Sequence, residues 1–454
     1  MTRVLIGISA LMLAGCSMTP AYERPAAPVP ATLPQGEAYA PRPAGAQAGL
    51  AWTQLVQDAR LRTIIDRALA NNRDLRAAIA NVQSARAQYR VQRAARLPTI
   101  TADAGASISH RNDARLDNYS ADIGFSAFEI DLFGRVRSLT QAALESYLAT
   151  EEGARATRIA MIAETASAYA TLAADQDLLV LARQTQASAQ RTLDLTRTLN
   201  AAGLAGKLDV HQAETIVEQA ASDVAATVTQ VAQDRNALDL LAGAPVEDAL
   251  LPQSLDSLIS GIARVPAGLS SDILLQRPDV LQAEHQLKAA NADVGAARAA
   301  MFPTISLTSA IGVASTALSS LFGSDAFGWS ASPSASLPIF GGPNRGNLDY
   351  SKAQRDLYLA QYEKAIQTAF QEVADGLARA GTIDAQQVAQ RRLVIASSRA
   401  YDLAEQRYRA GIDTFLTALN SQRSLYNAQQ SAIATDLALV NNRILLYRVI
   451  GADQ

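Results

Sequence analysis

Few residues in this sequence could carry out covalent or acid–base chemistry, and those few are scattered. The three histidines, His110, His211 and His285, stand far apart, and no spacing brings two of them to one metal ion. No glycine-rich loop ending in lysine is present to bind a phosphate, and no nucleophile elbow is present to carry a catalytic serine. The sequence therefore predicts a protein that is not an enzyme and that binds no metal or cofactor.

Cys16 is the single cysteine of the chain, and its position indicates a covalent modification. It follows Arg3 and an apolar run from Val4 to Ala14, which together form a signal sequence too short to span a bilayer. The sequence LAGC at 13–16 resembles a bacterial lipoprotein cleavage box. That resemblance implies removal of residues 1–15 and a lipid on Cys16, and Ser17 in place of an aspartate indicates the outer membrane.

Composition sets further limits on function. The chain has 454 residues, a net charge of −3 and a mean hydropathy of +0.02, so there is no electrostatic case for nucleic acid as a partner. After the signal sequence no run approaches the roughly 18 apolar residues of a membrane helix. We therefore expect any membrane crossing to be made by strands.

The hydrophobic period changes at Pro98, where an Ala- and Arg-rich helical stretch gives way to strict alternation. About two hundred residues later the same junction recurs at Pro303. The triplets RAA at 93–95 and PTI at 98–100 match RAA at 298–300 and PTI at 303–305. The sequence therefore predicts a tandem duplication.

Each half is expected to hold a helical stretch, two strands, one very long helix and a shorter helix. The expected ranges are about 58–96, 99–109, 119–132, 136–200 and 208–242, then 280–300, 304–314, 329–339, 347–410 and a last helix to 447. The predicted organisation is a signal peptide over 1–15, an extended lipid-anchored tether over 16–51, a first repeat over 52–243 with its hairpin at about 99–132, an inter-repeat segment over 244–278, and a second repeat over 279–454 with its hairpin at about 303–340.

Three local features carry their own predictions. The alternation slips at Phe128, which predicts a β-bulge or the exit of the strand from the sheet. Pro333 lies inside the second return strand and predicts a local break there. Asp279 with Gln282 predicts a helix N-cap.

The strands have one apolar and one polar face, and about 11 residues suffice to cross a bilayer as a tilted strand. Four strands cannot close a barrel with a usable lumen, so several chains must share one. The residues predicted to face lipid are Ile100, Ala104, Ile123, Phe125, Ile305, Leu307 and Leu337, and those predicted to face the lumen are Thr101, Asp122, Ser306 and Ser332.

With these features assembled, the chain resembles the TolC-like outer-membrane efflux channels, in particular their lipoprotein branch. The most specific motif is VPAGLSSDILLQRPDV at 265–280, and two helix-turn-helix segments, AAGLAGKLDVHQAE and YRAGIDTFLTALNSQRSLYNAQQ, also match. The resemblance implies an α+β fold and a homotrimer that forms a twelve-stranded outer-membrane β-barrel continuous with a periplasmic α-helical barrel. It also implies two partners, a periplasmic adaptor (membrane fusion) protein and an inner-membrane RND-type transporter.

The resemblance also implies a periplasmic gate where the long helices reverse. The matching positions for constricting residues are Leu416 and Asn420, and many members place an aspartate where this chain has Asn420. Asp209 is a candidate for a replacement ring of charge, and Tyr408 and Asp413 for hydrogen bonds between neighbouring helix pairs. The alternatives are that Leu416 is a buried helix contact and Asp209 an ordinary carboxylate at a helix N-terminus.

The leading hypothesis is a passive exit duct of a drug-exporting tripartite pump. The nearest alternative is the outer-membrane duct of a type I protein secretion system. Two other classes, a lipid-anchored hydrolase or binding protein and a structural coiled-coil lipoprotein, are opposed by the missing catalytic motifs and by the four alternating strands. Heavy-metal export is disfavoured because the chain beyond Met18 holds only two methionines, Met161 and Met301, and no cysteine.

Overall fold

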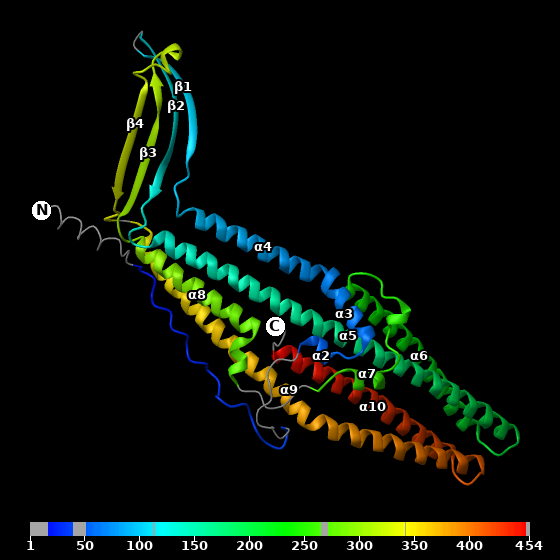
Figure 1. Cartoon of the computed structure of the whole chain (residues 1–454). Coiled ribbons are helices and arrows are strands. Elements are labelled where there is room, and N and C mark those ends of the chain that lie inside the picture. The colour runs from blue at the N-terminus through cyan, green and yellow to red at the C-terminus, as the bar shows by residue number, and fades with distance from the viewer. Residues whose placement is uncertain (1–16, 40–50, 112–113, 265–270, 341, 451–454) are drawn as a thin grey trace. The chain divides into compact units, whose positions relative to one another are not determined.

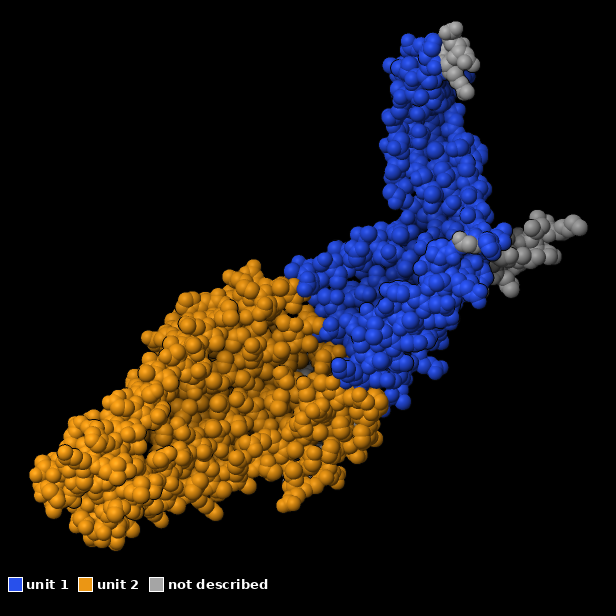
Figure 2. Space-filling view, turned by 180° about the vertical axis from the view of Figure 1, so that it is seen from behind, with its two compact units in different colours: residues 1–27, 80–152, 281–365 blue, residues 28–79, 153–280, 366–454 orange. Residues whose placement is uncertain are grey.

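The computed structural model describes residues 17–39, 51–111, 114–264, 271–340 and 342–450. The chain forms two compact units, each built from segments that are far apart in the sequence (Figures 1 and 2). Unit 1 holds residues 1–27, 80–152 and 281–365, and unit 2 holds residues 28–79, 153–280 and 366–454. Cys16 lies outside the described residues.

Unit 1 contains a four-stranded antiparallel sheet in the order β1-β2-β3-β4. The strands are β1 (Thr101–Arg111), β2 (Ala114–Glu129), β3 (Thr304–Ser315) and β4 (Phe327–Ser336). The two predicted hairpins therefore pair through β2 and β3 into one sheet (Figure 1). β2 begins five residues earlier than the sequence pattern predicted, because the polar residues of the loop also join the ladder.

The strand register confirms that the sheet has one apolar and one polar face. Ala102 pairs with Ile123, Ile123 with Ile311, and Ile311 with Trp329, so these four side chains share a face. The adjacent row across β2, β3 and β4 runs from Asp122 through two glycines, Gly312 and Gly328. Ile100 and Leu337, which were predicted to belong to the apolar face, lie just outside the strands.

The predicted bulge is confirmed, and the predicted break is wrong. The register of β2 against β3 shifts between Phe125 and Phe128, and Ala127 between them has a positive φ of 52°. Pro333 instead pairs with Leu307 inside an uninterrupted strand. β4 is the last strand of the sheet within this chain, where the missing N–H of a proline is tolerated.

Helices continue from the sheet. α4 (Arg73–Ala94) precedes β1, α5 (Arg135–Ala201) follows β2, α8 (Pro278–Ala299) precedes β3 and α9 (Asn344–Arg409) follows β4. α5 begins directly after Gly134, whose φ is 78°, and the Asp131 carboxylate accepts hydrogen bonds from the N–H groups of Val136 and Arg137 at 3.1 and 2.8 Å. This side-chain cap fixes the point at which strand becomes helix.

The N-terminal strap, residues 17–27, packs as extended chain on α5 and α8 in unit 1. The Asn291 side chain donates to the carbonyl of Pro20 at 2.8 Å, and the hydroxyls of Thr19 and Ser138 lie 2.8 Å apart. Arg24 pairs with the buried Glu284 through two hydrogen bonds of 2.6 and 3.0 Å. Residues 17–27 of the predicted tether are therefore extended and bound to unit 1, whereas residues 28–39 contain bends and a turn.

Unit 2 holds an extensive apolar core, and it also holds α9 from residue 366 onward. The elements that build this core are α2 (Trp52–Leu55), α3 (Ala59–Asn71), α6 (Lys207–Ala242), α7 (Leu255–Gly261), α10 (Phe415–Ile450) and the part of α5 from residue 153 onward. The core brings together residues from all of these elements, among them Trp52, Leu61, Ile65, Ile162, Tyr169, Leu238, Leu258, Val440 and Tyr447. Among the helices of the described residues, none has both the length and the apolarity to cross a membrane.

Two helix starts differ from prediction. The stretch expected to be helical from 58 to 96 is divided at Asn72, a buried residue whose side chain accepts from the N–H groups of Asp74 and Leu75. α8 starts at Pro278, so Asp279 lies in its first turn and is no N-cap. Its carboxylate binds the buried Arg277, which also contacts Glu372 at 2.7 Å.

Candidate functional site

The candidate gate lies in unit 2, where α5 turns into α6 and α9 turns into α10. Both turns contain a glycine with a φ of 72°, Gly203 and Gly411. Leu204 N–H donates to the carbonyl of Leu199, and Ile412 N–H donates to the carbonyl of Arg407, which is the same six-residue closure in both turns. Only glycine adopts this left-handed conformation without strain, so the two sequence repeats reverse direction in the same way.

Tyr408 is buried between the two hairpins. Its hydroxyl lies 3.1 Å from that of Thr196 on α5, and its ring meets the Phe415 ring edge-on at 5.5 Å. The surrounding apolar cluster combines both hairpins, with Leu193, Ala213, Phe415, Ala418 and Leu419 as further members. Tyr408 therefore connects the hairpin of the first repeat to that of the second within this chain.

Asp413 makes its contact within its own turn. Both carboxylate oxygens accept hydrogen bonds from the Arg407 guanidinium, at 2.6 and 3.0 Å. The hydrogen bonds from Arg407 hold the pKa of Asp413 below its usual value. This ion pair fastens the end of α9 to the residues just before α10.

Leu416 and Asn420 lie one helical turn apart in the first two turns of α10 and are both exposed. Leu416 is 53% exposed, whereas Phe415, Ala418 and Leu419 beside it are buried in the cluster around Tyr408. Within this chain Leu416 is thus no buried helix contact. Three other apolar side chains are exposed around the turns, Leu204, Leu208 and Ile412.

Asp209 lies in the first turn of α6. One carboxylate oxygen accepts the N–H of Gly206 at 3.0 Å, so the side chain caps its own helix. The geometry is that of the ordinary helix-start carboxylate.

The structure therefore gives the five predicted positions different surroundings. Tyr408 lies in the shared cluster, Asp413 and Asp209 bind within their own turns, and Leu416 and Asn420 share an exposed face. Sequence reasoning missed Thr196, Phe415 and Arg407 as partners. The one usable signal was the spacing of Arg407 and Asp413 across the Gly411 turn, since a tight reversal brings opposite charges on its two sides together. In the described ranges no group of three or more metal-binding side chains is assembled.

Comparison with known proteins identifies the family. The family model described as outer membrane efflux protein matches residues 64–244 and 269–452. The chain is 46% identical over 465 residues to the probable efflux pump outer membrane protein TtgC of Pseudomonas putida, covering 99% of this chain and 96% of TtgC.

Solved structures agree. A membrane protein from Pseudomonas aeruginosa is 40% identical, with a TM-score of 0.88 and coverage of 96% of this chain and 100% of that one. The open state of the Neisseria gonorrhoeae MtrE outer membrane channel is 35% identical, with a TM-score of 0.85 and coverage of 96% and 98%. The chain therefore belongs to the outer membrane efflux protein family.

Proposed function

We propose that this outer-membrane efflux protein is the passive exit duct of a tripartite pump, receiving small molecules from an inner-membrane RND-type transporter through a periplasmic adaptor protein. The observation that carries the proposal is a sheet with one apolar and one polar face that continues directly into long helices within a single chain. Such a sheet suits lipid on one side and water on the other, and the family match supplies the efflux role.

The duct is a homotrimer in this proposal. Four strands leave two open edges, and exposed edges are normally paired or covered. Three chains would supply twelve strands, enough for a barrel with an open lumen. The same closure would bring three copies of each α5–α6 and α9–α10 turn to one end of the helical part.

At that end the proposed gate is formed by the exposed Leu416 with Asn420. Three symmetry-related Leu416 side chains would narrow the bore by apolar contact and dewetting. Tyr408 and Asp413 hold the supporting turns, and Asp209 contributes charge close to the first turn. Asn420 carries no charge, so it supplies no carboxylate ring for cation selectivity.

Lipid on Cys16 is the proposed second attachment to the membrane. The strap begins one residue later and is bound to unit 1 through Thr19, Pro20 and Arg24, which would hold the lipid close to this unit. Mass spectrometry of the purified protein tests this. Loss of residues 1–15 with two or three acyl chains is expected, and an unmodified chain that keeps Met1 contradicts it.

Efflux in living cells tests the function itself. A strain lacking this chain should accumulate a fluorescent pump substrate several-fold above the parent strain, and the intact chain should restore the parental level. Equal accumulation in all three strains would overturn the proposal. Loss of a secreted protein from the medium, with drug accumulation unchanged, would favour the type I secretion duct instead.

A further inference from the structure

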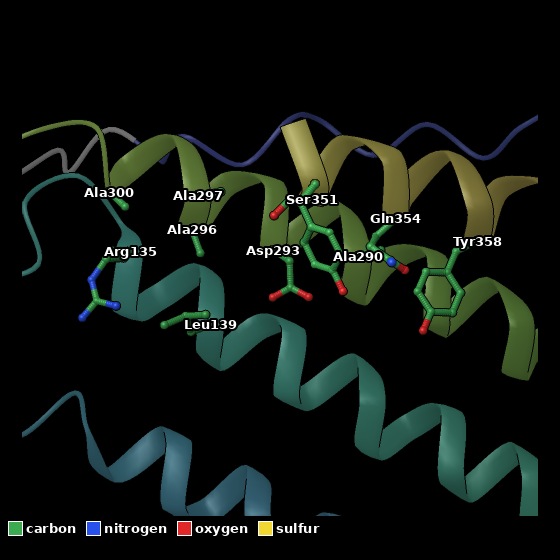
Figure 3. A pocket seen from close by; sticks show the side chains of 11 residues that line it. Arg135, Leu139, Ala290, Asp293, Ala296, Ala297, Ala300, Ser351, Gln354 and Tyr358 are labelled. Atoms are coloured by element: carbon green, nitrogen blue, oxygen red, sulfur yellow. The ribbon is translucent and has the colours of Figure 1, made fainter. Parts of the chain in front are cut away.

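A cavity of about 400 Å³ lies within unit 1 among α5, α8 and α9 (Figure 3). Its polar lining consists of Asp293 from α8, Tyr350, Ser351, Gln354 and Tyr358 from α9, and Arg135 from α5. Much of the remaining wall is alanine, which leaves room beside the polar groups. The volume falls in the range of pockets that hold drug-sized molecules, roughly 300–1,000 Å³.

The two sides of α8 show which way this cavity faces. Glu284, Asn291 and Gly295 contact the N-terminal strap and lie four to seven residues apart, on one side of the helix. Asp293 is two residues from both Asn291 and Gly295, and two residues correspond to about 200° around a helix. Asp293 and the cavity therefore lie on the side of the helix layer opposite the strap. If the strap leads to a lipid outside the duct, the cavity faces the bore.

Asp293 supplies the one uncompensated charge of the cavity. No hydrogen bond or ion pair to its carboxylate occurs among the described residues, whereas Arg135 is neutralised by two hydrogen bonds to Glu129, the longer of 2.9 Å. The surrounding helices partly desolvate Asp293 and raise its pKa, although its side chain remains exposed to the cavity. A cation that binds beside this carboxylate would compensate for the solvation that the carboxylate has lost.

The tyrosines give the site its second feature. Tyr350, Gln354 and Tyr358 follow one another at four-residue steps, so all three project from one stripe of α9. Figure 3 shows Asp293, Gln354 and Tyr358 reaching into the same space from the two helices. Aromatic rings next to a carboxylate favour cations, because the face of each ring is electronegative.

We propose that this cavity is a wall site for planar organic cations passing through the duct, with Asp293 as the counter-ion and Tyr350 and Tyr358 as the aromatic surfaces. The proposal rests on the proposed function, since the ligand reaches the cavity from the bore. It assigns to the duct a preference for positively charged ligands, and the residues responsible are far in the sequence from the gate residues. An anion of the same size would meet an unneutralised carboxylate and bind poorly.

Equilibrium binding to the purified full-length protein in neutral detergent tests the site. The probe is ethidium, followed by fluorescence anisotropy, with fluorescein as an anion of similar size. Asp293→Asn should raise the Kd for ethidium at least tenfold, and so should the double variant Tyr350→Leu/Tyr358→Leu. Asp356→Asn is the matched control, because Asp356 is an exposed carboxylate on α9 that points away from this stripe and pairs with Arg355. It should bind ethidium as the wild type does.

A pH series adds a second readout. Ethidium affinity should fall on acidification as Asp293 takes up a proton, and because its pKa is raised, the fall should begin at higher pH than an ordinary aspartate would give. Asp293→Asn should remove this dependence. The double tyrosine variant keeps the test decisive if the aspartate variant fails to form trimers.

Equal Kd values for wild type, Asp293→Asn and Asp356→Asn would overturn the site, and so would tight fluorescein binding. These results would not contradict the proposed function as an exit duct, because ion conductance and cellular efflux are measured separately. A chain that binds ethidium through Asp293 but restores no efflux would instead count against the proposed function.

Discussion

At the residue scale, the contact between Tyr408 and Thr196 is a polar link buried between the two turning hairpins. The remaining contacts of that cluster are apolar and would permit sliding. The hydroxyl of Tyr408 therefore helps to fix the register of the two hairpins, together with the part-buried contacts of Tyr401 with Ser188 and of Tyr426 with Asp223. Such a link suits a closure that must open without unfolding.

Tyr408→Phe should loosen this end while leaving the ring in place. The lost hydrogen bond is worth about 0.5–1.5 kcal/mol, and Thr196 keeps its bond to the carbonyl of Thr192. Amide hydrogen exchange should become faster in residues 405–420. Tyr401→Phe is the control, because its hydroxyl makes a longer contact of 3.2 Å, with Ser188, and is only part-buried. Similar exchange rates in the two variants would argue against a special role for Tyr408.

Asp175 on α5 gives a pH-dependent prediction. Burial, together with a hydrogen bond to Asp234 on α6, raises the pKa of Asp175 to about 7. A carboxyl that keeps its proton in the folded state stabilises that state at low pH, and this contribution is lost as the pH rises from about 4 through 7. Asp175→Asn should flatten this part of the stability curve and raise the thermal midpoint at pH 8. A midpoint that changes with pH as in the wild type would contradict the assignment.

At the element scale, most helices and strands were predictable and their contacts were not. The period changes at Pro98 and Pro303 located the strands, and the glycine turns located the helix ends within a few residues. The sequence did not predict the division of the helical stretch at Asn72. An asparagine inside an apolar helical pattern indicates a cap only when the hydrogen bonds of its side chain are known. Pro333 was misjudged because strand order decides whether a proline breaks a ladder.

The same limit of prediction from sequence applies to the gate residues, the strap and the cavity. Residue types near the turns could be named from the sequence, but the burial of Tyr408 depends on helices separated by two hundred residues. The docking of the strap and the facing of Asp293 with Tyr358 depend on long-range packing in the same way. No local pattern carries that information.

The fit of the strap depends on Gly295. A Cβ added there would approach Thr19 to 2.2–2.8 Å, which requires the strap to move. Gly295→Ala should therefore cost about 1–3 kcal/mol of stability and expose residues 17–27 to proteases. Gly346→Ala is the control, since a Cβ there meets nothing within 4 Å, and helical Ala is favoured by about 0.5–1 kcal/mol. Equal protection of the strap in both variants would show that it tolerates displacement.

The two faces of the sheet should respond differently to charge. Ile123 shares its face with Ala102 and Ile311, so Ile123→Arg should cost about 2–4 kcal/mol in the membrane. Ser332 pairs with Thr308 on the polar face, and Ser332→Arg should be tolerated. The yield of heat-resistant oligomer in detergent extracts measures both. Equal losses would show that the faces are assigned wrongly.

At the scale of the whole molecule, the two tandem sequence repeats each provide both parts of a duct, the sheet and the long helices. Each copy contributes a hairpin to the sheet and a helical pair that reverses at a glycine. The side chains at the two turns differ. The turn at Gly411 contains the Arg407–Asp413 ion pair and leads into Leu416, whereas the turn at Gly203 is followed by the self-capping Asp209. The proposed constriction is assigned to the second copy, where Leu416 and Asn420 share an exposed face of α10.

Single-channel conductance of the purified oligomer in planar bilayers tests this account most directly. The wild type should conduct, and Leu416→Ala should raise the conductance or the open probability while the heat-resistant oligomer keeps its stability, because an exposed side chain is removed. An oligomer that never conducts would contradict the duct, and unchanged conductance with a destabilised oligomer would show that Leu416 holds the wall together and does not close the bore.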